Sequence, residues 1–425
     1  MVLFFFLAIA LILGVPVGIS LGVASIGGIL ASDGAYQLHL ITQSMITALD
    51  SFPLMAVPFF ILAGEIMGQG GISKRLLNTA EAFCGHYTGG LGAVAIVACM
   101  FFAAVSGSAP ATTAAIGGIM IPTMIAKKYG DGYSAGLTAA AGSIGVMIPP
   151  SIPAVIYSVS ANASISDMFM AGIVPGILVG VGLCAFNWFH CLGNHDIIKS
   201  ERRYTMREKL WIVWEAKWSL LMPIIILGGI YGGIFTPTES AAIAVVYGLI
   251  VSLFLYRDIR FKDLYQIFAK SGLTTATVLI IMGTASTFGR LLNLESIPTD
   301  VANAMTALTD NKYVILLLII ALLLLVGCFM ETLAAIIILT PILLPVANAV
   351  GVDTVHFGVI MIVGLAIGFI TPPLGVDLFV ASGIAKISLE KISKAIIKPL
   401  LVMVAILLLI AVCPPLATFI PSLMK

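Results

Sequence analysis

Hydroxyl-bearing residues and prolines occur together at two places in the first half of the chain. One stretch reads S-G-S-A-P-A-T-T-A and starts at Ser106, and another reads I-P-P-S and ends at Ser151. Proline lacks an N–H and clashes with the preceding helical turn, so nearby carbonyl groups lose their helical donors. Carbonyl and hydroxyl oxygens are ligands that hard cations prefer. We therefore predict a first sodium site built from Ser106, Ser108, Thr112, Pro149 and Ser151.

The second half of the chain carries a corresponding pair of interruptions. One lies at 327–332 and the other is the T-P-P-L-G run at 371–375. They predict a second sodium site, with Gly327, Glu331, Thr332, Thr371 and Pro372 as its residues. Half-helices that begin at such breaks present N–H groups and partial positive charge to an anion, so Ser108 and Ser151 are also candidate substrate contacts. The alternative is that these prolines and hydroxyls only kink and pack membrane helices.

A few ionisable residues stand inside or beside long apolar stretches. Arg290 follows 19 uncharged residues and could hold a substrate carboxylate bidentately, or it could extend to the membrane surface. Asp377 is a further candidate substrate residue, and Asp377 and Glu331 could each bind a cation, carry a proton or form a structural pair. Glu65 and Glu239 are expected to serve only as helix caps.

Composition defines the elements that must hold these residues. Of 425 residues, 60% are apolar and 10% charged, with a net charge of +1 and a mean hydropathy of +1.13. Soluble domains carry about 25% charged residues, and a near-zero net charge gives no attraction for nucleic acid. Uncharged runs such as 1–32, 87–126 and 399–424 are long enough for membrane helices. We therefore predict an all-α polytopic membrane protein in a lipid bilayer.

The chain repeats itself with a shift of 223 residues. I-G-V-M-I-P-P at 144–150 recurs as I-G-F-I-T-P-P at 367–373, and I-M-I-P at 119–122 recurs as I-L-L-P at 342–345. We predict repeats at 1–194 and 218–425. Each contains a re-entrant helical hairpin, near 88–126 and near 313–350. A proline-broken transmembrane helix follows each hairpin, near 133–158 and near 355–380.

The segment 195–217 separates the two repeats. It holds ten charged residues, six of them basic, and all four tryptophans lie in or beside it. An amphipathic helix on the membrane surface fits this pattern, with a solvated linker as the alternative. Placing the segment in the cytoplasm puts most basic residues inside. Both termini are then expected to be periplasmic, and the second repeat is inverted relative to the first. Inverted repeats with broken helices are typical of secondary transporters.

Enzymatic and ATP-driven functions find no support in the motifs. The sequence has no HExxH and no Walker A motif, because the dipeptide Gly-Lys never occurs, and its six cysteines form no CxxC pair. We therefore expect no catalytic residues, no organic cofactor and no metal other than Na⁺.

Four motifs together resemble the large membrane subunit of tripartite ATP-independent periplasmic (TRAP) transporters. They are S-G-S-A-P-A-T-T-A at 106–114, I-P-P-S at 148–151, F-T-P-T-E-S-A-A at 235–242 and T-P-P-L-G-V-D at 371–377. The resemblance covers nearly the whole chain and is strongest to the sialic acid branch. It implies a sodium-driven, elevator-type importer of organic acids in the bacterial inner membrane. It also implies two partners, a small four-helix membrane subunit and a soluble periplasmic substrate-binding protein.

The resemblance also carries residue roles. It adds the 145–151 break, including Gly145, to the first sodium site, and it assigns 327–332 and 371–373 to the second. By similarity, Arg290 contacts the substrate. Three other functions remain open at this point: an autonomous proton-coupled dicarboxylate carrier, an anion channel and a structural scaffold.

Overall fold

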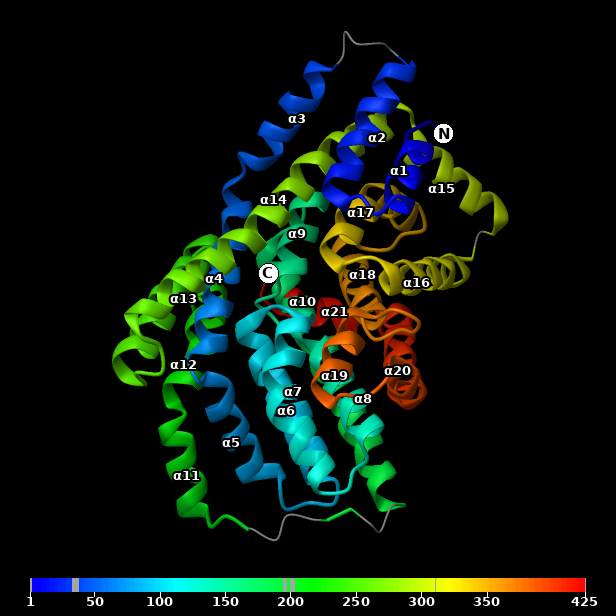
Figure 1. Cartoon of the computed structure of the whole chain (residues 1–425). Coiled ribbons are helices and arrows are strands. Elements are labelled where there is room, and N and C mark those ends of the chain that lie inside the picture. The colour runs from blue at the N-terminus through cyan, green and yellow to red at the C-terminus, as the bar shows by residue number, and fades with distance from the viewer. Residues whose placement is uncertain (1, 33–37, 194–196, 199–202, 310, 425) are drawn as a thin grey trace.

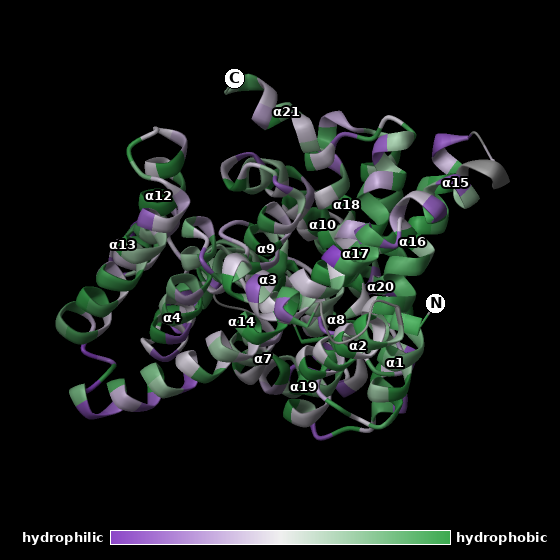
Figure 2. Cartoon of the chain, turned by 90° about the horizontal axis from the view of Figure 1, so that it is seen from above, coloured by the Kyte–Doolittle hydropathy of each residue, from purple (hydrophilic) through white to green (hydrophobic). Residues whose placement is uncertain are grey.

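The structure is a computed structural model that describes residues 2–32, 38–193, 197–198, 203–309 and 311–424. Throughout these ranges the regular secondary structure is helical (Figure 1). The cause is the near-continuous apolar sequence, because backbone groups in a bilayer must be satisfied within the helix itself. Hydrophobic residues cover most of the helix surface in the view from above (Figure 2). The prediction of an all-α membrane fold is confirmed.

Ten α-helices form the first half of the chain, with 3₁₀ turns at Phe52–Met55 (η2) and Ser143–Val146 (η3). The helices α3 and α5 lie in stretches for which the sequence predicted none, because both are too short or too polar to read as membrane spans. The ten are α1 (Val2–Ile12), α2 (Val17–Ser32), α3 (His39–Leu49), α4 (Ala56–Gln69), α5 (Ile72–Cys84), α6 (Gly90–Ser106), α7 (Ala109–Ala126), α8 (Asp131–Gly142), α9 (Ile152–Ala161) and α10 (Ile165–Leu192).

Eleven α-helices form the remainder, with a π-turn at Val251–Leu255 (η4) and a 3₁₀ turn at Phe261–Asp263 (η5). They are α11 (Met206–Glu215), α12 (Lys217–Tyr231), α13 (Pro237–Ile250), α14 (Leu264–Leu294), α15 (Ile297–Leu308), α16 (Lys312–Phe329), α17 (Thr332–Ala349), α18 (Thr354–Gly368), α19 (Val376–Ala385), α20 (Leu389–Val412) and α21 (Pro415–Leu423).

Eight helices in the described ranges are long and apolar enough to cross a membrane, or nine if the bent pair α11–α12 counts as one span. The arms α7, α16 and α17 belong to this set by length and composition. The protein is therefore a multi-pass membrane protein.

The helix starts reproduce the shift found in the sequence. The hairpin arms α7 and α17 begin at residues 109 and 332, and 332 − 109 = 223. The next helices, α8 and α18, begin at 131 and 354, again 223 apart. The proline-containing breaks at 143–151 and 369–375 follow in register. Each half therefore contains the predicted hairpin and the predicted broken helix.

Cross-contacts between the halves sort the helices into two groups. In one, α14 packs on α2, α3 and α4, and α13 packs on α4. In the other, α19 packs on α7 and α8, and α20 packs on α8. The hairpin tips and both breaks belong to the second group, so each group combines elements from both halves of the chain.

The described part of the linker forms only the short helix α11, which meets α12 at an angle of 62°; residues 194–196 and 199–202 lie outside the described ranges. Thr205 and Glu208 cap α11 reciprocally. Its Leu210, Trp211 and Trp214 side chains are exposed. The placement of 195–217 on a membrane surface stays a prediction.

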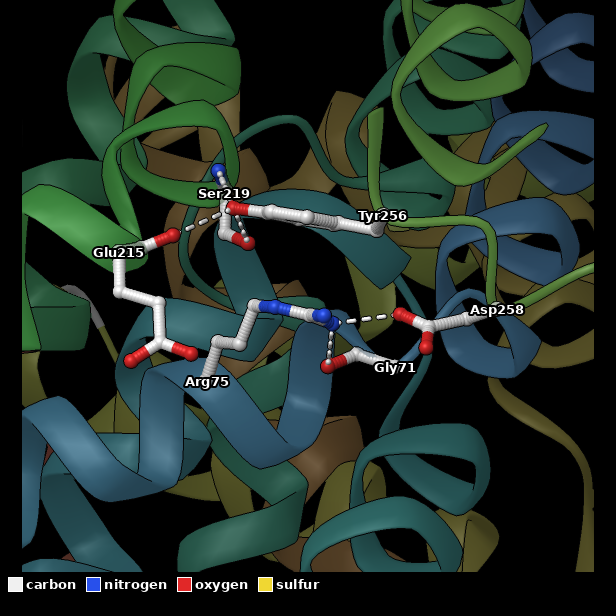
Figure 3. Close-up of polar contacts among 6 residues, drawn as sticks. All are labelled: Gly71, Arg75, Glu215, Ser219, Tyr256 and Asp258. Atoms are coloured by element: carbon white, nitrogen blue, oxygen red, sulfur yellow. Dashed lines mark hydrogen bonds and ion pairs between the residues drawn. The ribbon is translucent and has the colours of Figure 1, made fainter. Parts of the chain in front are cut away.

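A polar cluster holds α5 beside the linker and the start of α14 (Figure 3). Arg75 Nη1 donates to Asp258 Oδ2 at 2.5 Å, and its guanidinium lies 3.6 Å from the centre of the Tyr256 ring. The Tyr256 hydroxyl donates to the Glu215 carbonyl at 3.2 Å and accepts from the Ser219 amide. Two chain segments more than 180 residues apart are thereby fastened to each other.

Candidate functional site

The first hairpin tip is built by a reversal at Gly107. This residue ends α6 with φ of +59°, in the left-handed region that favours glycine. Ser108 is extended and Pro110 lies in the first turn of α7, where proline's missing N–H costs nothing. The reversal places the Ser106 and Thr112 hydroxyl oxygens 2.8 Å apart.

The first tip packs directly against the first proline break. A Cβ on Gly145 would lie 2.5 Å from Thr112 Oγ1 and 2.6 Å from the Ser108 carbonyl oxygen, and a Cβ on Gly107 would lie 2.8 Å from the Pro150 carbonyl oxygen. Glycine therefore lets break and tip approach closely. Four residues of the predicted first sodium site lie together here: Ser106, Ser108, Thr112 and Gly145.

Pro149 and Ser151 face another direction. Both border a small space between the break and helices α10 and α18. The Ser151 hydroxyl donates to the Val146 carbonyl at 2.6 Å and accepts from the Ala154 amide, which makes it the N-cap of α9. Ser151 is buried and does not border the central cavity described below, so its predicted substrate contact is not present in this conformation.

The second tip repeats this packing with different chemistry. A Cβ on Gly327 would lie 3.0 Å from the Gly368 Cα, and the Cys328 thiol donates to the Thr371 carbonyl at 3.2 Å. The Thr371 hydroxyl donates to the Ile367 carbonyl. Gly327, Thr371 and the adjacent Pro372 of the predicted second sodium site therefore lie at one contact between tip and break.

Both tips open onto one central cavity of about 430 Å³. Ser106, Ser108 and Pro110 border it from the first hairpin, and Glu331 and Thr332 border it from the second. The Thr332 hydroxyl is buried and has no hydrogen-bond partner. Helices α7 and α17 both begin at the cavity, and neither has a side-chain cap. The cavity therefore combines hydroxyl groups, free helix N-termini and a carboxylate.

The opposite wall of the cavity comes from α4 and α14. It includes Glu65, Gln69, Lys270 and Thr274, and Lys270 Nζ lies 2.9 Å from the Glu65 carboxylate. The interpretation of Glu65 as a helix cap is wrong, because this residue lies inside α4 and pairs with α14. Glu239, in contrast, forms the expected capping box with Thr236 at the start of α13.

Sequence reasoning missed Glu65 and Lys270 as site residues. A usable signal existed, because each is an isolated charge in a long apolar helix, the criterion that singled out Arg290.

Arg290 and Asp377 lie away from this cavity. Arg290 borders a separate cavity of about 530 Å³ near the far end of α14, and it donates to the Ser44 hydroxyl at 3.2 Å. Asp377 is fully buried in the first turn of α19. Neither of its carboxylate oxygens has a hydrogen-bond partner. Their roles as substrate contacts stay predictions.

The profile of one protein family matches residues 4–416, and its description reads tripartite ATP-independent periplasmic transporter, DctM component. This chain belongs to that family. The DctM family is a family of transporter permeases, so the expectation that the chain is not an enzyme is confirmed, as is the resemblance to the large TRAP subunit.

Curated relatives of this DctM-family chain carry different substrate names. The isethionate TRAP transporter permease protein DctMQ of Oleidesulfovibrio alaskensis is 49% identical over 98% of this chain, which spans 66% of that relative's length. The sialic acid permease SiaM of Vibrio cholerae is 39% identical, with 96% of this chain and 95% of the relative covered. A C4-dicarboxylate permease DctM of Pseudomonas aeruginosa is also 39% identical, with 88% and 87% covered.

A solved structure supports the fold alone. The YdaH transporter of Alcanivorax borkumensis superposes with a TM-score of 0.69 over 90% of this chain and 89% of its own, at 15% identity.

Proposed function

We propose that this DctM-family permease imports a small organic acid together with Na⁺ across the bacterial inner membrane by an elevator movement. The observation that carries the proposal is the single cavity at which both hairpin tips meet. The helix group that holds the tips and breaks would move as the transport part, and the group around α4, α13 and α14 would stay as the scaffold.

The two contacts between tip and break would each bind one Na⁺. In the first, Ser106, Ser108 and Thr112 supply oxygens close to Gly145. In the second, Thr371 and the unpartnered Thr332 hydroxyl supply them. An inward Na⁺ movement is worth roughly 2.3 kcal/mol per charge per 100 mV of membrane potential, so transport needs no ATP.

The substrate class follows from what the relatives' names have in common. Isethionate, C4-dicarboxylates and sialic acid are all organic acids, and two uncapped helix N-termini with Lys270 in the cavity suit an acidic group. We retain sialic acid, N-acetylneuraminate, as one candidate and rank it equally with the other two. A small membrane subunit and a periplasmic binding protein would complete the transporter, with both termini periplasmic and 195–217 cytoplasmic.

Uptake into proteoliposomes tests the proposal. The chain is reconstituted with and without the two partner subunits, and labelled isethionate, succinate and N-acetylneuraminate are offered with and without a Na⁺ gradient. We expect uptake of at least one acid that requires both the gradient and the binding protein. Uptake by the chain alone that ignores Na⁺ and stops when a pH gradient is collapsed would instead establish a proton-coupled dicarboxylate carrier.

A matched pair of variants tests the first sodium site. Thr112→Val removes a hydroxyl that touches Ser106, whereas Thr123→Val removes one from the exposed face of the same helix, where it bonds only to the Ile119 carbonyl. We expect the first variant to raise the Na⁺ concentration needed for half-maximal uptake and the second to leave it unchanged. Equal behaviour of the two would remove Thr112 from the site.

A further inference from the structure

The central cavity contains one basic side chain. Of the residues that border it, all within the described ranges, three are charged: Glu65, Lys270 and Glu331. Lys270 Nζ contacts the Glu65 carboxylate at 2.9 Å, yet the Lys270 side chain is 65% exposed and that of Glu65 only 20%. An ion pair this exposed is weakly held, so another anion can replace Glu65 at the ammonium group.

The groups opposite Lys270 also favour an anion. The uncapped N-termini of the 18-residue helices α7 and α17 reach the cavity, and the buried Thr332 hydroxyl there has no partner. Thr274 lies one helical turn beyond Lys270 and borders the same cavity. An acid in this space would therefore have an ammonium group on one side and helix N–H groups on the other.

Helix α14 carries a second basic residue at its other end. Lys270 and Arg290 are the only Asp, Glu, Lys or Arg residues among its 31, and 20 residues separate them. At a rise of 1.5 Å per residue this is about 30 Å, close to the thickness of the membrane core. Arg290 borders its own cavity, which Ile337 and Pro341 of the second hairpin also border.

We propose that Lys270 is the scaffold's contact for the acidic group of the substrate in the conformation seen here, with Glu65 as an internal competitor. Arg290 takes the corresponding place when the hairpin tips stand at the other end of α14. This inference rests on the proposed function. Glu65 holds Lys270 when the cavity is empty and gives it up when an acid enters, so the site is never left with an unpaired ammonium group.

Four variants test the assignment by the substrate concentration for half-maximal uptake. Lys270→Gln should raise this concentration about tenfold or more, since hydrogen bonds to charged groups are the stronger ones, while the maximal rate changes less. Lys270→Arg should retain most of the affinity. Glu65→Gln should lower the half-saturating concentration, because the competitor is gone. Lys262→Gln is the control, since Lys262 is an exposed lysine in the turn before α14.

An unchanged half-saturating concentration in Lys270→Gln would overturn the proposal, as would a rise in Glu65→Gln equal to that in Lys270→Gln. A second measurement separates this inference from the transport proposal. Isethionate, as a probe, should raise the melting temperature of the purified wild-type chain more than that of Lys270→Gln. If no acid is transported but this difference is seen, the transport proposal fails and the anion site stands. If the two proteins respond equally to isethionate, the anion site fails.

Discussion

Substitution of Gly145 by alanine is the sharpest test of how tip and break fit together. The added Cβ would lie 2.5 Å from Thr112 Oγ1 and 2.6 Å from the Ser108 carbonyl oxygen, whereas ordinary contact begins at 3.4 Å. The threonine can rotate, but the carbonyl belongs to the backbone. The tip must therefore move back by 3.4 − 2.6 = 0.8 Å. Overpacking of this kind costs about 1–3 kcal/mol, so the melting temperature of the purified protein should fall.

The same displacement should affect sodium dependence. It moves the Ser108 carbonyl and the Thr112 hydroxyl away from the break, so the oxygens proposed to surround the first Na⁺ no longer converge. We expect a higher Na⁺ concentration for half-maximal uptake into proteoliposomes.

Gly118→Ala provides the control on the same hairpin. Gly118 lies inside α7 and a Cβ there would meet nothing within 4 Å. Because alanine favours a helix over glycine by about 0.5–1 kcal/mol, this variant should melt slightly higher and keep wild-type sodium dependence. A Gly145→Ala protein with wild-type melting would refute the packing argument. Lower melting with unchanged sodium dependence would refute the sodium assignment alone.

Two further predictions concern stability. Lys391 donates to Asp131 and holds the pKa of that carboxyl below its usual value; the pair's contribution is therefore present near neutral pH and is lost as the pH falls through the folded-state pKa. Because both side chains are exposed, Asp131→Asn should cost less than about 1 kcal/mol near pH 6 by denaturant unfolding, and a cost that does not shrink toward pH 3 would contradict this reasoning. Asn187 is buried, donates to the Gly89 carbonyl and accepts from the Tyr133 hydroxyl; Asn187→Leu should lose about 1–3 kcal/mol for each unpaired group. Adding Tyr133→Phe should recover part of that loss in thermal unfolding, and no recovery would show that the hydroxyl finds another acceptor.

The sequence by itself determined the membrane class, the repeat and the position of each interruption. These features are local: uncharged runs make membrane helices, and glycine and proline act on the turn in which they stand. The bounds of α7 and α17, and the breaks that follow them, could therefore be predicted closely. The short helices α3 and α5 could not, because no long apolar run marks them.

Only the tertiary structure decided which of these features meet. Glu65 and Lys270 are 205 residues apart, and no spacing in the sequence indicates that α4 and α14 pack together. Arg290 satisfied the same criterion as Lys270 yet lies at another cavity, and Asp377, near the second break in sequence, is buried away from both. The physical reason is that backbone conformation depends on neighbouring residues, whereas the pairing of distant helices depends on how whole faces of them pack.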